Sequence, residues 1–135
     1  MLFVLNKTEK VTVRKAGLDD VQYVQEIADE MANSAQKRGT GIAVRSTDYI
    51  HAKITEGKAV IAVDASGKWA GFCYIESWSN ADYVANSGLI VSPDFRGQGL
   101  AKRIKKAIFK LSRQMYPDAK IFGLTTGLAV MKINS

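Results

Sequence analysis

Hydrophobic and polar positions along this chain alternate in segments typical of short strands and amphipathic helices. Continuous apolar runs or two-residue alternation predict strands at residues 11–14, 59–63, 69–76, 83–91 and 121–125. Apolar residues recurring every three or four positions predict helices at residues 18–36, 46–57 and 99–115, and a further helix is expected at residues 128–133. The resulting order is strand, two helices, three strands, helix, strand and helix.

Turn-forming residues divide these segments. Ser46 or Thr47 is a good N-cap for the second helix, and Gly57 is its expected stop. The turn at residues 64–67 joins two strands into a hairpin, and a polar loop at residues 77–82 follows it. Gly88 interrupts an otherwise apolar strand, which predicts a bulge that bends the strand and frees a backbone group.

The composition fits a single globular domain spanning residues 1–135. A chain of 135 residues suits one core, and its 47% hydrophobic and 24% charged residues are ordinary for such a domain. The longest apolar runs fall far short of the roughly 20 residues that span a bilayer, so no membrane association is expected. The apolar start at residues 1–5 lacks the basic segment of a signal peptide, which predicts a cytoplasmic protein.

The stretch from Val91 to Arg103 carries the most specific signal. A strand runs into it and an amphipathic helix runs out of it, with Pro93 and two glycines between them. Unpaired N–H groups and the positive end of the dipole make such a helix start an anion site, most often for phosphate. The stretch is neither a Walker loop nor a dinucleotide fingerprint, because neither glycine pattern is present.

Arg96-x-x-Gly99-x-Ala101, preceded by Val91-x-Pro93, resembles the acyl-CoA pyrophosphate loop of the GNAT-type N-acetyltransferase superfamily. The resemblance implies an α/β (α+β) fold with a central mixed sheet flanked by helices, and acetyl-CoA as co-substrate without a metal. It covers nearly the whole chain. In that family two more strands usually follow the last helix, so we expect a shortened or truncated chain whose sheet edge pairs in a homodimer.

The resemblance also implies which residues hold coenzyme A. Backbone N–H groups of the loop would point at the pyrophosphate, and the end of the preceding strand would pair with the pantetheine arm. The residues concerned are Ile90, Val91, Arg96, Gly97, Gln98, Gly99, Leu100, Ala101 and Lys102.

Net charge supports a polyanionic ligand near this turn. The formal charge is +6, and between Arg96 and Lys120 eight basic residues accompany one acidic residue, Asp118. For most of these lysines, however, the sequence favours a solvated helix face over contact with a phosphate. Nucleic-acid binding is not expected, because aromatic residues are not interleaved with the charges.

Proton transfer is less clearly assigned. Glu76, at the expected end of its strand beside a loop, is the candidate base, and Asp82 is an alternative. Cys73 is the only cysteine and lies mid-strand without a nearby histidine, which favours a buried residue over a nucleophile. Many members of the family place a tyrosine on the last helix as general acid, but residues 128–134 contain none.

In the family, the connection between the first two helices and the loop after the second hairpin strand usually form the substrate wall, so the resemblance implies an acceptor site there. Arg38 and Arg45 can grip a carboxylate bidentately, with Tyr74 and Trp78 as further wall residues. The sequence thus predicts an N-acetyltransferase that transfers the acetyl group of acetyl-CoA to a small primary amine, such as an amino acid, in a ternary complex. Two alternatives stay open: a protein lysine or N-terminal acetyltransferase, and a catalytically silent acyl-CoA-binding module.

Overall fold

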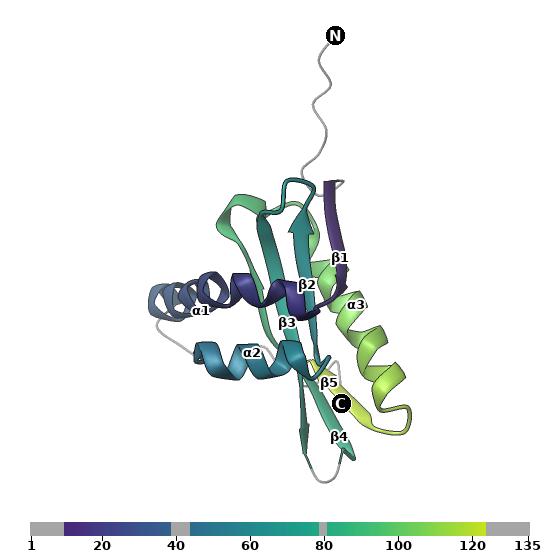
Figure 1. The fold of residues 1–135 in the computed structure, drawn as a ribbon. Coiled ribbons are helices and arrows are strands. Elements are labelled where there is room, and N and C mark those ends of the chain that lie inside the picture. The colour runs from purple at the N-terminus through teal and green to yellow at the C-terminus, as the bar shows by residue number, and fades with distance from the viewer. Residues whose placement is uncertain (1–9, 39–43, 79–80, 124–135) are drawn as a thin grey trace.

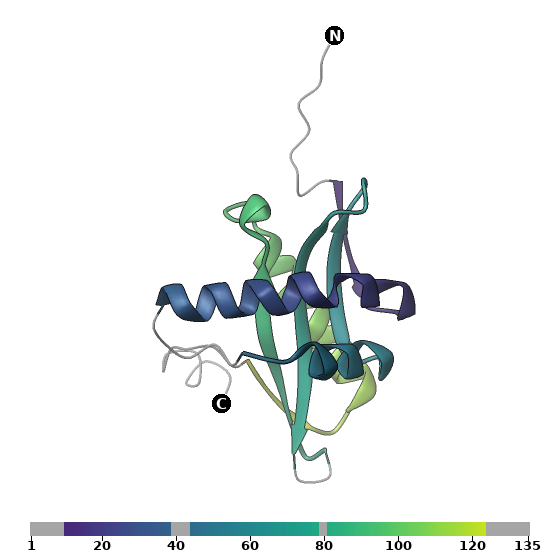
Figure 2. The ribbon, with the colours of Figure 1, turned by 60° about the vertical axis from the view of Figure 1, so that its left-hand side comes forward.

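The computed structural model describes residues 10–38, 44–78 and 81–123 of the chain. These residues form one sheet with strand order β1-β2-β3-β4-β5. Helices α1 and α2 cover one face of the sheet and α3 covers the other, as Figures 1 and 2 show from two sides. The strands are β1 Val11–Lys15, β2 Ala59–Asp64, β3 Trp69–Trp78, β4 Tyr83–Val91 and β5 Lys120–Gly123, and the helices are α1 Val24–Arg38, α2 Thr47–Thr55 and α3 Leu100–Met115.

The first four strands are antiparallel neighbours, whereas β5 is parallel to β4. This is the mixed α/β sheet that the resemblance implied, and the predicted element order is confirmed as far as residue 123. The helix expected at residues 128–133 lies outside the described residues. None of the helices in the described part is both long and apolar enough to cross a membrane.

Local sequence explains most element boundaries. The hydroxyl of Ser46 accepts a hydrogen bond from the Tyr49 N–H, which caps α2 as expected. Residues after α2 turn through Gly57, whose φ of 74° is left-handed and favours glycine. The structure differs from the single helix expected from residue 18. Leu18–Tyr23 form a 3₁₀ helix, and α1 begins only at Val24.

That 3₁₀ helix is fixed by a buried carboxylate. Asp20 is 2% exposed and accepts two hydrogen bonds from Arg14, at 2.7 and 2.9 Å, and one from the Gly17 N–H at 2.8 Å. Burial alone would raise the pKa of Asp20, but the hydrogen bonds from Arg14 and Gly17 outweigh it and lower the pKa. Asp20 therefore joins β1 to the start of the helical layer as an ionised group.

The sheet has a buried cluster on each face. On the α3 face, Leu100, Ile104 and Ile108 pack against strand residues such as Val60 and Ile75. On the other face, residues of α1 and α2 such as Ile27 and Ile50 pack against Phe72, Tyr74 and Ile90, among others. Met115, expected on the buried face of its helix, is instead 36% exposed.

Two strands differ from their predicted extents. β3 continues two residues past Glu76, and Trp78 pairs with Tyr83, so Ser77 and Trp78 belong to the strand and not to a loop. The prediction that Glu76 ends the strand was therefore wrong. β5 is half-buried and not buried as expected, because it lies at the end of the sheet order with neighbours on one side in the described part.

Candidate functional site

A bulge divides β4 into two parts with different neighbours. The register to β3 shifts between Phe72↔Ile90 and Tyr74↔Ser87, so β4 carries one extra residue there. Gly88 lies in this bulge with φ of 67°, and the predicted bulge is thereby confirmed. A Cβ on Gly88 would lie 2.1 Å from Cε1 of Tyr74, so only glycine lets the backbone pass so close to that ring.

β5 pairs with only the first part of β4. It pairs with β4 from Tyr83 to Asn86, and within the described residues the part of β4 after the bulge has no strand on that side. Figure 1 shows β5 beside the lower part of β4 while the upper part leads away to α3. The sheet thus presents an open strand edge next to the bulge.

The direction of the backbone groups decides which residue faces this edge. The Ser92 N–H donates to the Ala70 carbonyl at 2.8 Å, so the Ser92 backbone points toward β3. Because successive strand residues point to alternate sides, the Ile90 backbone also faces β3, and that of Val91 faces the open edge. The structure therefore makes Val91, but not Ile90, available for pairing with an extended ligand.

The glycine loop joins this edge to α3. Gly97 and Gly99 both have φ of 77°, and a Cβ at either position would meet nothing within 4 Å. Glycine is thus required here by backbone conformation, and the space above the loop is open. The prediction that these two glycines shape an accessible turn at the helix start is consistent with this geometry.

Six consecutive N–H groups, from Gly97 to Lys102, have no hydrogen-bond acceptor in the described part of the chain. The first intrahelical bond is that from the Arg103 N–H to the Gly99 carbonyl, at 3.4 Å. Such a set of donors at the positive end of a 16-residue helix is suited to an anion.

Three of the predicted loop residues contribute less than expected. Leu100 is 1% exposed and packs in the core cluster on the α3 face, so its side chain is not available to a ligand. The Arg96 N–H points to the Pro93 carbonyl at 3.5 Å, and its guanidinium bonds to the Val91 carbonyl at 3.1 Å and to Glu30 at 2.6 Å. Ile90, as described above, faces β3.

A second group of polar residues lies beside the bulge, between β3 and α2. Glu76 accepts a hydrogen bond from the Tyr49 hydroxyl and lies 2.7 Å from the Lys53 ammonium. Arg45 donates from Nε to the Tyr74 hydroxyl at 2.9 Å and from Nη2 to Glu76 at 3.5 Å. We call these five residues the β3–α2 cluster.

The surroundings of Glu76 determine its protonation. Burial alone would raise its pKa, but hydrogen bonds from Lys53 and Tyr49, together with the charges of Lys53 and Arg45, outweigh burial and lower the pKa. Glu76 is therefore a carboxylate at neutral pH. Burial and the bond to Glu76 raise the pKa of Tyr49, which stays protonated.

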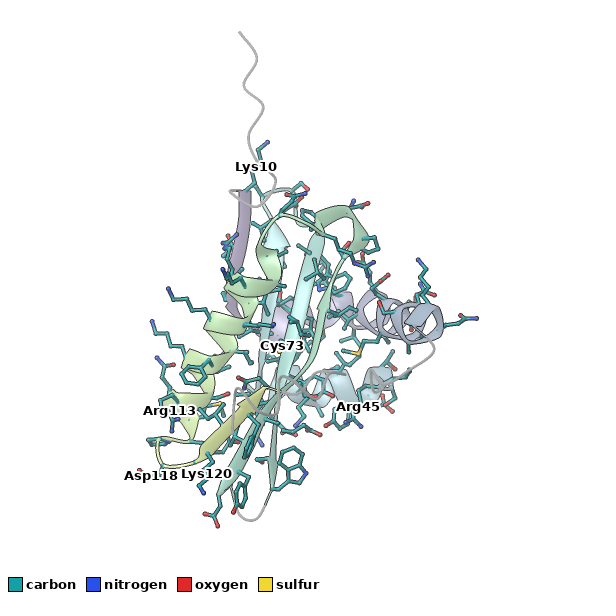
Figure 3. The ribbon with its side chains drawn as sticks, turned by 180° about the vertical axis from the view of Figure 1, so that it is seen from behind. Lys10, Arg45, Cys73, Arg113, Asp118 and Lys120 are labelled. Atoms are coloured by element: carbon teal, nitrogen blue, oxygen red, sulfur yellow. The ribbon has the colours of Figure 1, made fainter. Side chains whose placement is uncertain are left out.

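Several of the residues predicted for the acceptor site lie close together in the structure. Arg45, Tyr74 and Glu76 come together as expected, and Figure 3 shows Arg45 on the side of the sheet that carries α2. Trp78 follows Glu76 by two positions on the same strand face and is 47% exposed. The side chain of Arg38 lies outside the described residues.

Tyr49 and Lys53 were not predicted as site residues. They lie four residues apart on α2, on the face toward β3, and this spacing was the only available signal. Cys73, labelled in Figure 3, is buried in the middle of the sheet, and burial raises the pKa of its thiol to about 12. It is therefore unsuited to act as a nucleophile.

Comparison with known proteins agrees with the geometry. The model of the acetyltransferase (GNAT) family matches residues 24–129, and the chain belongs to this family. The predicted family and fold are thereby confirmed, and the description of the matching family is that of acetyltransferases. No curated protein sequence matches the chain.

Solved structures show the same fold. An N-acetylglutamate synthase from Neisseria gonorrhoeae, in complex with coenzyme A and N-acetyl-glutamate, is 21% identical with a TM-score of 0.67, over 88% of this chain and 26% of that chain. A Mycobacterium tuberculosis protein in complex with CoA and NLQ is 17% identical with a TM-score of 0.67, over 90% and 69% of the two chains.

A diaminobutyrate acetyltransferase from Paenibacillus lautus, in complex with L-2,4-diaminobutyric acid and coenzyme A, is 13% identical with a TM-score of 0.64. The alignment covers 85% of this chain and 65% of that one. This chain thus spans about a quarter of the Neisseria protein and about two thirds of the other two. At these identities the likeness concerns the fold.

Proposed function

We propose that this protein is an N-acetyltransferase that transfers the acetyl group of acetyl-CoA to the primary amine of a small molecule carrying a carboxylate, such as an amino acid. The observation that carries the proposal is the run of N–H groups from Gly97 to Lys102 that lack acceptors among the described residues, next to a strand edge that is open in the same part of the chain. This arrangement offers donors for a pyrophosphate and, on Val91, a backbone partner for an extended arm.

Charge at the start of α3 supports a polyanionic donor. The first turn of α3 carries no acidic residue, and Lys102 and Arg103 lie there instead. Cations near a helix N-terminus oppose the helix dipole and are slightly unfavourable without an anion. A pyrophosphate bound at the loop would remove this repulsion and would interact favourably with the Lys102 side chain, whereas the Arg103 guanidinium donates to the Val11 carbonyl at 2.8 Å. The arrangement therefore favours phosphate binding over a purely structural turn.

The acceptor would bind at the β3–α2 cluster. Two cations, Arg45 and Lys53, accompany one anion, Glu76, so the cluster has an excess positive charge. Nη1 of Arg45 has no partner among the described residues, and its side chain is 31% exposed. A free guanidinium edge favours a carboxylate ligand. Coenzyme A and amino-acid ligands in the related solved structures agree with this choice.

The chemical step follows from this placement. The neutral amine nitrogen attacks the thioester carbon, the C–N bond forms, and the C–S bond breaks so that coenzyme A leaves as a thiolate. The Val91 N–H, on the open edge, would donate to the developing oxyanion. Glu76 would accept the proton of the amine, directly or through water, and pass it to solvent, because a carboxylate of low pKa does not retain it.

One observation favours the second candidate, a silent acyl-CoA-binding module. Glu76 is held by Tyr49, Lys53 and Arg45 and has a lowered pKa, which makes it a weak base. Such a cluster can stabilise the fold without taking part in a reaction. The same donor loop would then bind acyl-CoA without turnover.

A thiol-release assay with acetyl-CoA distinguishes the two. The acceptor panel contains amino acids, polyamines and peptides, and calorimetry measures acetyl-CoA binding in parallel. A lower KM for an amino acid than for its decarboxylated amine is the expected result. Binding without turnover for every acceptor would support the silent module, turnover only with peptides would support a protein acetyltransferase, and absence of binding would contradict the proposal.

A further inference from the structure

Glu30 of α1 connects the helical layer to the donor loop. Its carboxylate lies 2.6 Å from Nη2 of Arg96, a residue 66 positions later in the chain. The Ser34 hydroxyl, one helical turn further along α1, donates to the same carboxylate oxygen at 3.1 Å and accepts from Arg96 at 3.3 Å. The Glu30 side chain is only 12% exposed and Ser34 is buried, whereas the Arg96 side chain is 45% exposed, so only the α1 side of the contact is shielded from water.

Arg96 transmits this contact to the two parts of the donor site. Its backbone lies immediately before Gly97, and its Nε donates to the Val91 carbonyl at 3.1 Å. One guanidinium therefore joins three elements: α1 through Glu30, the end of β4 through Val91, and the loop to which Arg96 itself belongs. Because Gly97 and Gly99 are conformationally permissive, the loop needs an external contact to keep one geometry.

The bond from Arg96 to Val91 also determines which backbone group of Val91 is left for a ligand. Val91 presents both a carbonyl and an N–H on the side away from β3, as the register requires. Arg96 occupies the carbonyl, which leaves the N–H as the available group. A ligand at this edge is then favoured when it offers an acceptor oxygen to Val91, as a thioester carbonyl does.

We propose that Glu30 is a positioning residue for the acyl donor: it holds Arg96 against the Val91 carbonyl and so fixes the end of β4 and the glycine loop in the geometry that binds acetyl-CoA. This inference rests on the proposed function. Glu30 acts through Arg96 and does not touch the donor. Its loss is expected to weaken donor binding while acceptor binding and the chemical step change little.

The test compares Glu30→Gln with Glu26→Gln. Glu26 lies one turn earlier on α1 and is exposed, so it controls for the loss of one charge from the helix. Because Arg96 is partly exposed and the glutamine amide can still accept a hydrogen bond, Glu30→Gln is expected to raise the Kd for acetyl-CoA about two- to fivefold. The KM for acetyl-CoA should rise by a similar factor, with kcat and the KM for the acceptor nearly unchanged. Glu26→Gln should leave all four quantities as in the wild type.

A double-mutant cycle that combines Glu30→Gln with Arg96→Gln tests whether Glu30 acts through Arg96. Because both side chains belong to one contact, the double variant should bind acetyl-CoA no more weakly than Arg96→Gln alone. Thermal unfolding of each variant separates binding from fold stability. A lowered Tm with unchanged Kd for acetyl-CoA, or additive effects of the two substitutions on Kd, would overturn the inference. Failure of the wild type to bind acetyl-CoA would instead contradict the proposed function.

Discussion

The backbone of Gly88 lies against the ring of Tyr74, so closely that a Cβ on Gly88 would lie 2.1 Å from Cε1 and 2.6 Å from Cδ1 of the ring. Tyr74 in turn accepts the hydrogen bond from Arg45. The bulge that opens the donor edge and the cluster proposed to bind the acceptor are therefore in direct contact. A change at Gly88 should affect both.

We expect Gly88→Ala to lower the free energy of unfolding by about 2–4 kcal/mol, because it adds a steric overlap to the strain of a positive φ. Gly57→Ala is the matched control: Gly57 has φ of 74°, and the nearest atom to its Cβ would be 3.9 Å away. Backbone strain alone should lower the free energy of unfolding of Gly57→Ala by about 1 kcal/mol. Urea unfolding measures both, and equal losses would contradict the close packing of Gly88 on Tyr74.

Arg45 should determine the preference for a carboxylate acceptor. Arg45→Ala removes the guanidinium and should raise the KM for an amino-acid acceptor about tenfold or more, because a charge-assisted bond is lost. The matched amine without the carboxylate serves as the control substrate, and its KM should change little. Steady-state kinetics with the two acceptors measure the effect. A parallel rise in both KM values would show that Arg45 only supports the structure.

The pH dependence of kcat/KM should reflect the lowered pKa of Glu76. Since that pKa lies below the ordinary value of about 4.3, Glu76 is ionised throughout pH 5–8 and contributes no ionisation there. The rate should rise with pH only as the acceptor amine loses its proton. Glu76→Gln should lower kcat without removing a limb from the profile. A limb between pH 6 and 7 that disappears in this variant would contradict the assignment.

Asp20 should make the free energy of unfolding depend on pH in the acid range. Its folded pKa is lowered, so its contribution is fully present above the unfolded value of about 3.9 and is lost as pH falls through the folded pKa. Asp20→Asn is expected to lower the free energy of unfolding by about 1–3 kcal/mol at pH 7, and the difference should shrink at low pH. Asp19→Asn, at an exposed neighbour, is the control. A difference that is independent of pH would contradict the ion pair with Arg14.

Much of the fold could be predicted because it depends on local patterns. The bounds of β4, the Ser46 cap and the bulge at Gly88 all follow from neighbouring residues. The error at Glu76 arose because Ser77 and Trp78 are exposed and polar or aromatic, which hides a strand that continues beyond the core. The homodimer and the cytoplasmic location stay predictions.

The site was less predictable because its key contacts join distant segments. The loop motif predicted the positive φ of Gly97 and Gly99, because this backbone conformation is encoded locally, and the role of the loop in binding the acyl donor stays a proposal. The bonds from Tyr49 and Lys53 to Glu76 and from Arg96 to Glu30 join residues that lie 23 to 66 positions apart in the chain. Only the packing of α1 and α2 on the sheet brings these side chains together.

The central claim is that the loop from Gly97 to Lys102 binds the phosphates of acetyl-CoA. Titration calorimetry of acetyl-CoA into the wild type and Gly99→Val tests it most directly. The valine enters open space, yet it covers the N–H donors and is disfavoured at φ of 77°. Saturable binding by the wild type and its loss in a folded Gly99→Val variant is the predicted result. Equal affinity of the two proteins would contradict the claim.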